Sequence, residues 1–502
     1  MVTVLAIPFL LTARLSLHWR VMHDAPIMLY LGLLVEHFHK VPYRDFFDMN
    51  TPGTYFAFAV LGRLTGYADA ALRVADLACL LLLMAATGFA LRPFGWRPAL
   101  VAPLLYGLSY MGLAQFHALQ RESLMLVPIA AAIALLSPGS RVSLGNRALG
   151  TGLLLGVAAT IKPAIVLDAA PFASFLIAEA WQDPASGRLR PLAVAAALLL
   201  AGIAAPLLAC WGYLVSTGAF TAFVDIARNY WPLYGQLGAL HETVQPPERL
   251  AYIASGLWAY GGHRWWLLPA VVGLWSALQR SGPGTREGRF VLLNAGLLVT
   301  HSLYPAASGQ FWPYHWFPLL LSLSFASALC LVQRESAVRT ATWAAPALIL
   351  LLVVSLLVRP PAPLARDLAG LPPEDPYGER VREISGYLRS HLGANDTVQP
   401  LDWTGGAVDA MLRSRARLAT PFVYDFHFYH HVSSPYIQQL RARFVTALYH
   451  ARPTYVIRVL SRKPWVQGVD TSRDFPELDY FLSLHYRLAL SGDGYQILAW
   501  DH

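Results

Sequence analysis

Residues 191–213 read PLAVAAALLLAGIAAPLLACWGY and contain no charged side chain. An apolar run of this length is typical of a helix that spans a lipid bilayer. The whole chain of 502 residues shares this character, because 56% of its residues are hydrophobic and only 14% are charged. Soluble domains have about 25% charged residues. The composition therefore excludes a disordered chain and argues against a soluble enzyme.

Further apolar runs predict a polytopic α-helical membrane protein with about eleven spans. A span needs about 20 mostly apolar residues, so the shorter runs are expected to be kinked or partly re-entrant. The predicted spans are 2–19, 71–91, 99–114, 123–137, 148–160, 164–181, 191–213, 265–279, 290–305, 316–333 and 341–358. The three cysteines lie far apart in apolar runs, which excludes a disulfide framework and gives no metal-binding spacing.

The distribution of charge divides the chain into two predicted domains. A transmembrane domain is expected over 1–359, and the proline-rich run that follows Arg359 cannot continue a helix. Residues 360–502 hold 15 basic and 15 acidic residues and are predicted to form a soluble α/β domain. Its expected strands are 397–403, 418–424, 454–459 and 495–500, and its expected helices are 379–392, 405–413 and 435–450.

Arginine in alternate short loops predicts the orientation in the membrane. The arginine-rich loops contain Arg92 and Arg97; Arg141 and Arg147; Arg188 and Arg190; Arg280, Arg286 and Arg289; and Arg334 and Arg339. The short loops between them have only Arg121 and Lys162 as basic residues. By the positive-inside rule, the N-terminus is then cytoplasmic, and the long loops 20–70 and 214–264 lie outside together with the tail. Only three of 38 basic residues are lysine, which hints at a GC-rich bacterium, so we expect an inner membrane protein with a periplasmic tail.

The first outer loop combines acidic and aromatic residues. It begins with Asp24, continues as an apolar stretch over 27–38, and then reads VPYRDFFDMNTPGTY over 41–55. We expect such a loop to lie flat on the membrane surface, where a carboxylate can act as general base on an incoming hydroxyl. Asp24 could instead be the N-cap of a helix, and Asp45 and Asp48 could be turn formers.

Other polar residues gather at the predicted outer ends of the spans. Arg121, Glu122 and Lys162 lie there, and His315 opens the tenth span. The cations could clamp a phosphate at the headgroup level, or they could be ordinary anchors at the interface. His315 could donate a hydrogen bond to a phosphate or be a hydrogen-bonded interface histidine. The histidines of 426–431 do not have a spacing typical of a zinc site.

The stretch from Asp24 to Tyr55 resembles the first extracytoplasmic loop of GT-C glycosyltransferases. The similarity is greatest to the branch with protein mannosyltransferases and aminoarabinose transferases (glycosyltransferase family 39-like). That branch has an acid after the first span, a Gly/Pro-Tyr-Arg-Asp-Phe stretch, and then an acid and a proline near a tyrosine. Here these parts are Asp24, PYRDFFD over 42–48 and TPGTY over 51–55. Gln120-Arg121-Glu122, Lys162-Pro163 and Tyr314-His315 also look like features of bacterial members.

The resemblance implies an inverting transferase that moves a hexose or pentose from a polyprenyl-phosphate carrier to an extracytoplasmic glycolipid, polysaccharide or protein. The family's catalytic acid maps onto Asp24 and its second loop acid onto Asp48. The implied substrate-binding residues are Arg44, Asp45, Tyr55, Arg121, Glu122, Lys162 and His315. Relatives often have Asp-Glu at the first acid, whereas His23 and Ala25 flank Asp24 here, which weakens a two-acid metal site. No cofactor is expected to be required, and a divalent cation is not indicated.

Two other classes of function fit parts of the sequence. A transporter or flippase of a lipid-linked saccharide should have ionisable residues near the midplane of its spans and repeated halves. Asp168 is the one acid deep in an apolar run, and no internal repeat is visible. A non-enzymatic assembly protein would bind partners through its tail, but it would not need an acid-rich first loop against the membrane. The concentration of acids on the outer side favours glycosyl transfer.

Overall fold

The computed structural model describes residues 1–182, 189–332, 366, 369–371, 375–460, 463 and 466–501. Contacts between residues divide the chain into two compact units, and each unit is assembled from separate stretches of sequence. The first contains Met1–Trp19, Arg73–Cys210 and Ala254–Pro373. The second contains Arg20–Leu72, Trp211–Ile253 and Glu374–His502, so the long loops predicted outside the membrane belong largely with the tail.

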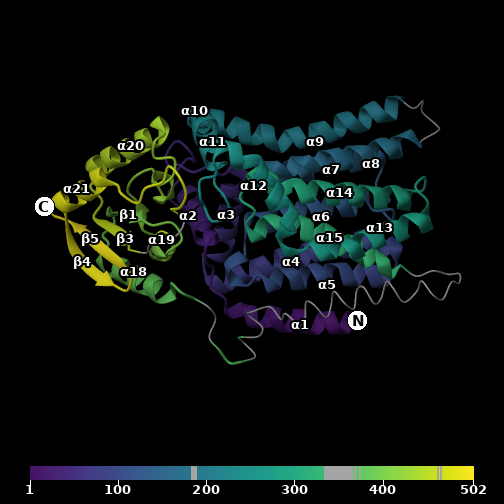
Figure 1. Cartoon of the computed structure of the whole chain (residues 1–502), viewed down its shortest axis with the longest axis horizontal. Coiled ribbons are helices and arrows are strands. Elements are labelled where there is room, and N and C mark those ends of the chain that lie inside the picture. The colour runs from purple at the N-terminus through teal and green to yellow at the C-terminus, as the bar shows by residue number, and fades with distance from the viewer. Residues whose placement is uncertain are drawn as a thin grey trace. The chain divides into compact units, whose positions relative to one another are not determined.

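Long apolar helices build the first unit (Figure 1). They are α1 (Val2–Leu15), α4 (Asp69–Leu91), α5 (Trp96–Gly112), α6 (Arg121–Leu136), α7 (Leu144–Ile161), α8 (Ala169–Trp181), α9 (Leu189–Ser216), α13 (Leu267–Ser281), α14 (Arg286–Ser308) and α15 (Phe317–Ala328). Each predicted span from 2–19 to 316–333 coincides with one of these helices. The predicted span 341–358 lies outside the described residues.

Six helical stretches among the described residues are long and apolar enough to cross a membrane. They are Asp69–Phe94, Leu144–Ile161, Pro163–Trp181, Leu189–Ser216, Arg286–Ser308 and Pro313–Leu331. The apolar helix Val2–His18 is shorter, and α5, α6 and α13 have 17, 16 and 15 residues. The predicted polytopic helical membrane fold is confirmed, with several helices that fall short of a full span.

Glycines let two of these helices approach closely. A Cβ atom on Gly152 of α7 would lie 2.2 Å from the carbonyl oxygen of Leu199 in α9. A Cβ atom on Gly156 would lie 2.6 Å from the carbonyl oxygen of Ile203. Small residues four positions apart are a common way for membrane helices to pack backbone against backbone. The two glycines therefore allow α7 and α9 to pack backbone against backbone.

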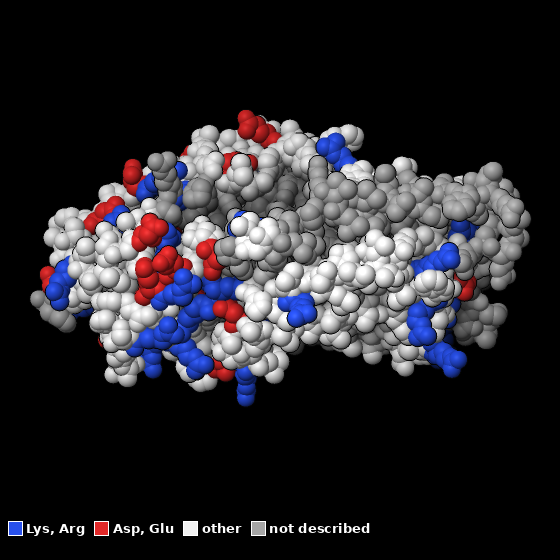
Figure 2. Space-filling model, turned by 90° about the horizontal axis from the view of Figure 1, so that it is seen from below, with Lys and Arg blue, Asp and Glu red and all other residues white. Residues whose placement is uncertain are grey.

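Ion pairs mark the two ends of the helical bundle. At one end, the carboxylate of Glu179, near the end of α8, forms two ion pairs. It lies 3.1 Å from the guanidinium of Arg147 in α7 and 2.5 Å from that of Arg289 in α14. At the other end of α7, Lys162 pairs with Glu122. The 18 residues of α7 rise about 27 Å between these ends, close to the thickness of a bilayer's hydrocarbon core. The described surface of this unit in Figure 2 is largely uncharged, with basic side chains gathered at one end.

The second unit contains a five-stranded sheet of order β2-β1-β3-β5-β4. Strands β1 (Thr397–Leu401), β2 (Arg417–Leu418) and β3 (Tyr455–Val459) are parallel, whereas β4 (Tyr486–Gly492) and β5 (Tyr495–Trp500) form an antiparallel pair next to β3. The helices of the tail are α18 (Gly378–His391), α19 (Ala407–Ser414), α20 (Pro435–Ala451) and α21 (Pro476–His485). Short helices α10 (Phe220–Asp225), α11 (Trp231–Tyr234) and α12 (Pro246–Ala259) lie in the second long loop.

The predicted elements of the tail are confirmed with one exception. The strand predicted over 418–424 is wrong, because only Arg417–Leu418 forms a strand. Beyond it the backbone serves other partners: the carbonyl of Pro421 accepts a hydrogen bond from the amide of Phe47, and that of Phe422 accepts one from the Gln399 side chain. The sequence also missed β4 and α21. Strand β4 is an edge strand with mostly exposed residues, so its sequence lacks a regular buried face.

The first outer loop folds into the second unit as two packed helices, α2 (Asp24–Glu36) and α3 (Pro52–Thr65). All residues of α2 from 24 to 34 are buried. Its Tyr30 hydroxyl donates to the carbonyl of Ala416 at 2.8 Å, and a Cβ atom on Gly32 would lie 2.7 Å from the backbone of α3. A helix on a membrane surface exposes one apolar face. The expectation that this stretch lies flat on the membrane is therefore wrong for α2, which is a core helix.

Candidate active site

Asp24 is the first residue of α2, and its side chain is 7% exposed. The N-cap position belongs to His23, which has the unusual backbone angles φ 59° and ψ −119°. The alternative that Asp24 is the N-cap is therefore wrong, because the N-cap is the preceding residue. A carboxylate in the first turn still interacts favourably with the helix dipole. The positive φ of His23 strains its backbone. Strain of this kind at a non-glycine residue costs about 1–3 kcal/mol and clusters at functional sites.

Histidine and aromatic side chains from three parts of the chain surround Asp24. The His23 Nδ1 atom lies 3.3 Å from the Asp24 Oδ1 atom. His241, from the second long loop, interacts electrostatically with Asp24, and the Trp403 ring lies 4.9 Å from the His241 ring. Burial, and after it the nearby His430, lower the pKa of His241 to about 4. His241 is therefore neutral at pH 7.

A small cavity of about 20 Å³ adjoins this group, and Arg20, His23, Pro26, Trp403 and Asp409 contribute to its walls. Sequence reasoning missed His241 and Trp403. Nothing in their local sequence distinguishes them, because only the folded chain brings the second long loop and the end of β1 to the start of α2. Their shared signal is the concentration of tryptophan and histidine in predicted outer segments.

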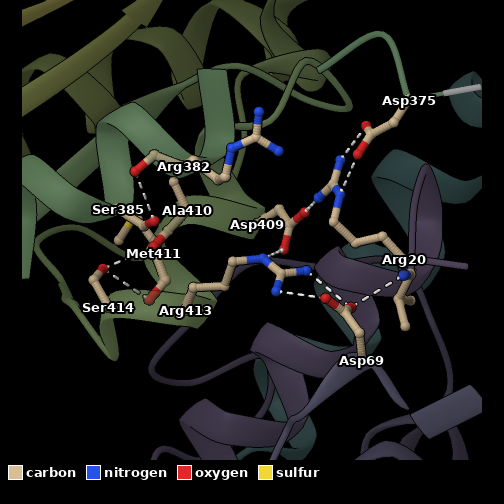
Figure 3. Close-up of polar contacts among 11 residues, drawn as sticks. Arg20, Asp69, Asp375, Arg382, Ser385, Asp409, Ala410, Met411, Arg413 and Ser414 are labelled. Atoms are coloured by element: carbon tan, nitrogen blue, oxygen red, sulfur yellow. Dashed lines mark hydrogen bonds and ion pairs between the residues drawn. The ribbon is translucent and has the colours of Figure 1, made fainter. Parts of the chain in front are cut away.

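An ion-pair network fixes the backbone just before Asp24 (Figure 3). Arg20 binds Asp375 through two bonds of 2.6 and 2.7 Å and also pairs with Asp409. Arg413 binds Asp69 through two bonds of 2.7 and 2.9 Å and binds Asp409 at 2.9 Å. Burial raises the pKa of Asp409 in spite of these two arginines. The network ties the entry to α2 to α19 of the C-terminal tail.

Asp48 is fully buried and is surrounded by neutral hydrogen-bond donors. Its Oδ1 atom accepts from the Tyr55 hydroxyl at 2.7 Å and from the Asn50 amide groups at 2.7 and 2.8 Å. Its Oδ2 atom accepts from the Tyr424 hydroxyl at 2.7 Å. Burial, together with the charge of Asp48, holds the pKa of both tyrosines well above its usual value, so they remain donors. This arrangement cross-links the first loop to the tail.

Arg44 and Asp45 form a bidentate pair at the surface of the second unit. Two bonds of 2.9 and 3.0 Å join the guanidinium to the carboxylate, and the carboxylate also accepts from the Val41 amide at 2.8 Å. The hydrogen bond from Arg44 lowers the pKa of Asp45 against the opposing effect of burial. Arg44 has a second bond to the Thr217 carbonyl at 2.9 Å. A phosphate would have to exchange with these partners to bind Arg44.

Four predicted site residues of the first unit come together around one carboxylate. Glu122, at the start of α6, is fully buried. The Lys162 Nζ atom at the end of α7 lies 2.9 Å from the Glu122 Oε1 atom, and the His315 Nε2 atom lies 3.7 Å from it. His315 belongs to the 3-10 helix η8 (Pro313–Trp316), and its Nδ1 atom lies 2.9 Å from the Ser308 hydroxyl. Arg121 interacts electrostatically with the same carboxylate.

The charges of this Glu122 cluster suit an anion. Arg121 and Lys162 contribute two positive charges against the single negative charge of Glu122, and a protonated His315 would add a third. Charge-assisted hydrogen bonds from lysine and arginine are the strong contacts with which proteins hold phosphate. The cluster lies entirely within the first unit, whereas Asp24, Arg44, Asp45, Asp48 and Tyr55 lie within the second.

Asp168 faces the inside of the helical bundle, as its sequence position suggested. Its carboxylate lies 2.9 Å from the His301 Nε2 atom and accepts from the Thr300 hydroxyl at 2.6 Å. The His301 Nδ1 atom lies 2.6 Å from the Ser322 hydroxyl. This group links η4 (Pro163–Asp168), α14 and α15. Sequence reasoning missed His301, which stands alone in an apolar helix. The buried pair is the one observation that favours the transport alternative.

The histidines at 426–431 pack as core residues. His427 is almost fully buried, its Nδ1 atom lies 2.7 Å from the Tyr230 hydroxyl, and its ring packs against Phe47 and Tyr424. Burial lowers its pKa to about 3. Among the described residues no group of three histidine, cysteine or acidic side chains could hold a metal ion.

Solved structures show which fold the chain has. ArnT from Cupriavidus metallidurans in the apo state is 14% identical, with a TM-score of 0.60 over 99% of this chain and 97% of that one. The same protein bound to undecaprenyl phosphate is 13% identical, with a TM-score of 0.58 over the same shares. The Archaeoglobus fulgidus oligosaccharyltransferase in the apo form is 11% identical, with a TM-score of 0.50 over 100% of this chain and 74% of that one.

These neighbours are members of the GT-C superfamily. The chain therefore has the fold of the GT-C membrane glycosyltransferases, as its first loop predicted. No protein-family model and no curated protein matches its sequence. At identities of 11–14% the likeness shows the fold, and the reaction has to be argued from the residues of the site.

Proposed function

We propose that the chain is an inverting glycosyltransferase that moves a sugar from a polyprenyl-phosphate carrier to an extracytoplasmic acceptor. The observation that carries this proposal is the position of Asp24 in a GT-C fold. It is a buried carboxylate directly after the strained His23, beside a small cavity and a neutral histidine. The structure of ArnT with undecaprenyl phosphate supports a polyprenyl phosphate as the carrier. The acceptor is a glycolipid, a polysaccharide or a protein.

The proposed reaction needs a base for the acceptor hydroxyl and cations for the leaving phosphate. Asp24 takes the proton from the acceptor hydroxyl while the oxygen forms a bond to the anomeric carbon. The bond from that carbon to the phosphate oxygen breaks on the opposite face, so the configuration inverts. The leaving polyprenyl phosphate keeps the electron pair as an anion. Arg121, Lys162 and His315 stabilise the charge that develops on it, and this mechanism requires no cofactor.

The other predicted residues have supporting roles in this proposal. Asp48, with Tyr55 and Tyr424, holds the first loop against the tail. This positions the segment that follows α2. Glu122 places Lys162 and His315 before the donor arrives. Arg44 and Asp45 lie at the surface of the same loop, where they contribute to binding of a substrate.

The arginine-rich loops support a periplasmic site. In this orientation the N-terminus is cytoplasmic, the transmembrane domain covers 1–359, and the domain over 360–502 lies in the periplasm of a bacterium. A reporter active only outside the cytoplasm, fused after Arg359, is expected to give signal, whereas one fused after Arg286 is not. The reverse pattern would place the site on the cytoplasmic side and overturn the proposal.

Purified protein incubated with a panel of polyprenyl-phosphate sugars tests the reaction itself. We expect release of polyprenyl phosphate that depends on the acceptor. Asp24→Asn should lower turnover by roughly 100-fold or more, the scale of general-base contributions, and should destabilise the protein by at most about 1 kcal/mol, because only the charge at the first turn is lost.

Glu379→Gln is the matched control, since it removes an exposed acid from the first turn of α18. It should leave turnover unchanged. An Asp24→Asn protein that transfers sugar at the normal rate would show that Asp24 is not the general base. Asp45 and Asp48 would be tested next. Movement of the intact lipid-linked saccharide across vesicles without sugar transfer would favour the transport alternative.

A further inference from the structure

The soluble tail contains a second polar cavity at the carboxyl ends of its parallel strands. Leu401, the last residue of β1, and Val459, the last residue of β3, both line it. The chain leaves β1 through α19 to reach β2 on one side, and returns through α20 to β3 on the other side of β1. The two neighbouring strands therefore lead away in opposite directions. Ligands of parallel α/β sheets bind in the crevice that such a switch point creates.

A buried carboxylate faces this cavity. Asp425 is 1% exposed and lines the cavity wall. Its Oδ2 atom pairs with Lys463 and accepts from the Tyr429 hydroxyl at 3.2 Å. Its Oδ1 atom is buried and has no hydrogen-bond partner among the residues that the structure describes. Because an unmade hydrogen bond to a buried charged group is costly, this atom is suited to accept from a hydroxyl of a bound molecule.

Cations surround the same cavity. Lys463, Arg458 and Arg473 line it against the two acids Asp425 and Asp479. Arg458 is bound to Asp479 at 2.8 Å, and Lys463 is bound to Asp425. Arg473 is exposed, and its guanidinium has no hydrogen bond to any described residue. An arginine fork of this kind matches a carboxylate or a phosphate.

Aromatic rings complete the lining. Tyr429 and Phe475 are both buried residues of the wall, and the Lys463 Nζ atom lies 4.4 Å from the centre of the Tyr429 ring. The cavity has a volume of about 50 Å³, far below that of pockets that enclose a whole ligand. It can therefore hold only part of one small unit and not a long chain.

We propose that this cavity binds an acidic monosaccharide unit, one that carries a carboxylate or a phosphate. A sugar hydroxyl donates to the Asp425 Oδ1 atom, the acidic group binds Arg473, and the apolar face of the ring lies against Phe475. A neutral sugar lacks the group for Arg473, and inorganic phosphate lacks the apolar face and a hydroxyl spaced from the charge. This inference does not depend on the transfer reaction, because it concerns binding to the tail alone.

Calorimetric titration of the full-length protein in detergent tests this binding site. The probes are D-glucuronic acid, D-glucose 6-phosphate, D-glucose and inorganic phosphate. We expect at least one acidic sugar to bind saturably, at least tenfold more tightly than glucose and inorganic phosphate. Saturable binding of neither acidic sugar, or equal binding of inorganic phosphate, would overturn the proposal. The two acidic sugars separate a carboxylate ligand from a phosphate ligand.

Two variants test whether the sugar binds at this cavity. Arg473→Gln changes an exposed side chain and should weaken the acidic sugar at least tenfold, while Asp425→Asn should weaken both acidic and neutral sugars. Arg487→Gln is the matched control, because Arg487 is 73% exposed on β4 and does not line the cavity. Equal binding by the Arg473→Gln and Arg487→Gln proteins would show that the sugar binds elsewhere. If Asp425→Asn does not fold, Arg473→Gln decides the question.

Discussion

Asp48 and Glu122 are both fully buried carboxylates, one in each unit, yet their surroundings differ in charge. Asp48 accepts hydrogen bonds from tyrosine hydroxyls and amides, which are all neutral. Glu122 lies among Lys162, Arg121 and His315. The first arrangement stores one negative charge in a closed group of donors. The second holds an excess of positive charge around an acid that an incoming anion can replace.

The difference shows that burial alone does not identify a functional carboxylate. Neutral donors stabilise a buried charge and fix the segments that carry them. Cations that share one acid keep part of their capacity for a second anion, which supports the proposed phosphate site at Glu122. The charge of the partners therefore separates a structural acid from an acid of a binding site.

The largest effect is expected at Asp48. Asp48→Ala leaves the hydroxyls of Tyr55 and Tyr424 and the Asn50 amide without an acceptor, at about 1–3 kcal/mol for each buried donor. We expect a loss of roughly 3 kcal/mol or more in the free energy of unfolding, seen as poor expression or an early thermal transition. Tyr424→Phe removes one donor only and should cost about 1 kcal/mol. A stable Asp48→Ala protein with low turnover would instead make Asp48 a residue of the reaction.

A smaller effect, on the donor, is expected at Lys162. Hydrogen bonds to charged groups contribute about 1.5–3 kcal/mol, so Lys162→Ala should raise the KM for the polyprenyl-phosphate sugar by roughly 10- to 100-fold. The thermal transition should also fall, because the fully buried Glu122 loses its lysine partner, so the KM is the readout that decides the role. Arg141→Ala is the control, because Arg141 is an exposed cation in a loop on the arginine-rich side. Normal kinetics at subsaturating donor in the Lys162→Ala protein would identify Lys162 as an interface anchor.

Glu122→Gln should have the opposite effect on ligand binding from Lys162→Ala. It removes the anion that competes with a phosphate for Lys162, so undecaprenyl phosphate should bind roughly threefold more tightly, a gain below 1 kcal/mol. The protein without ligand should be less stable, since its buried cations lose their partner. Thermal shift with and without undecaprenyl phosphate measures both changes. Weaker binding would show that Glu122 orients the cations and does not compete with the ligand.

The sequence predicted the helices and the family of folds because both depend on local signals. Apolar runs such as 191–213 define spans wherever they pack, and the motif from Asp24 to Tyr55 is contiguous. Arg121, Glu122, Lys162 and His315 were also predicted, since polar residues at the ends of apolar runs stand out. Their convergence on Glu122 needed the structure, because 193 residues separate the first from the last.

The rest of the site depends on contacts that leave no local trace. Tyr424 is an unremarkable residue in a predicted strand until the fold brings its hydroxyl to Asp48. The apolar stretch of α2 has the composition of a surface-bound helix, and only packing against α3 and α19 makes it a core helix. Strand β2 ended early because the first loop, far away in sequence, takes the hydrogen bonds that a longer strand would use. Tertiary partners decided each of these cases.

The smallest effect is expected on lowering the pH, which tests the ion-pair network just before Asp24. Burial disfavours the charged form of Asp375, but the Arg20 hydrogen bond outweighs it and lowers the pKa of Asp375 below its ordinary 3.8. The stabilisation is therefore complete above that value and is lost as the pH falls through the folded-state pKa. Asp409 has the opposite sign: its pKa is raised, so it favours the folded state when protonated and offsets part of the loss. Because Asp375 is partly exposed, Asp375→Asn should lower the melting temperature at pH 7 by no more than about 3 °C, and by pH 3 the difference from the wild type should shrink. Asp501→Asn, in the exposed pair with Arg487, should change neither value. A difference that persists at low pH would mean that Asp375 acts through packing and not through its charge.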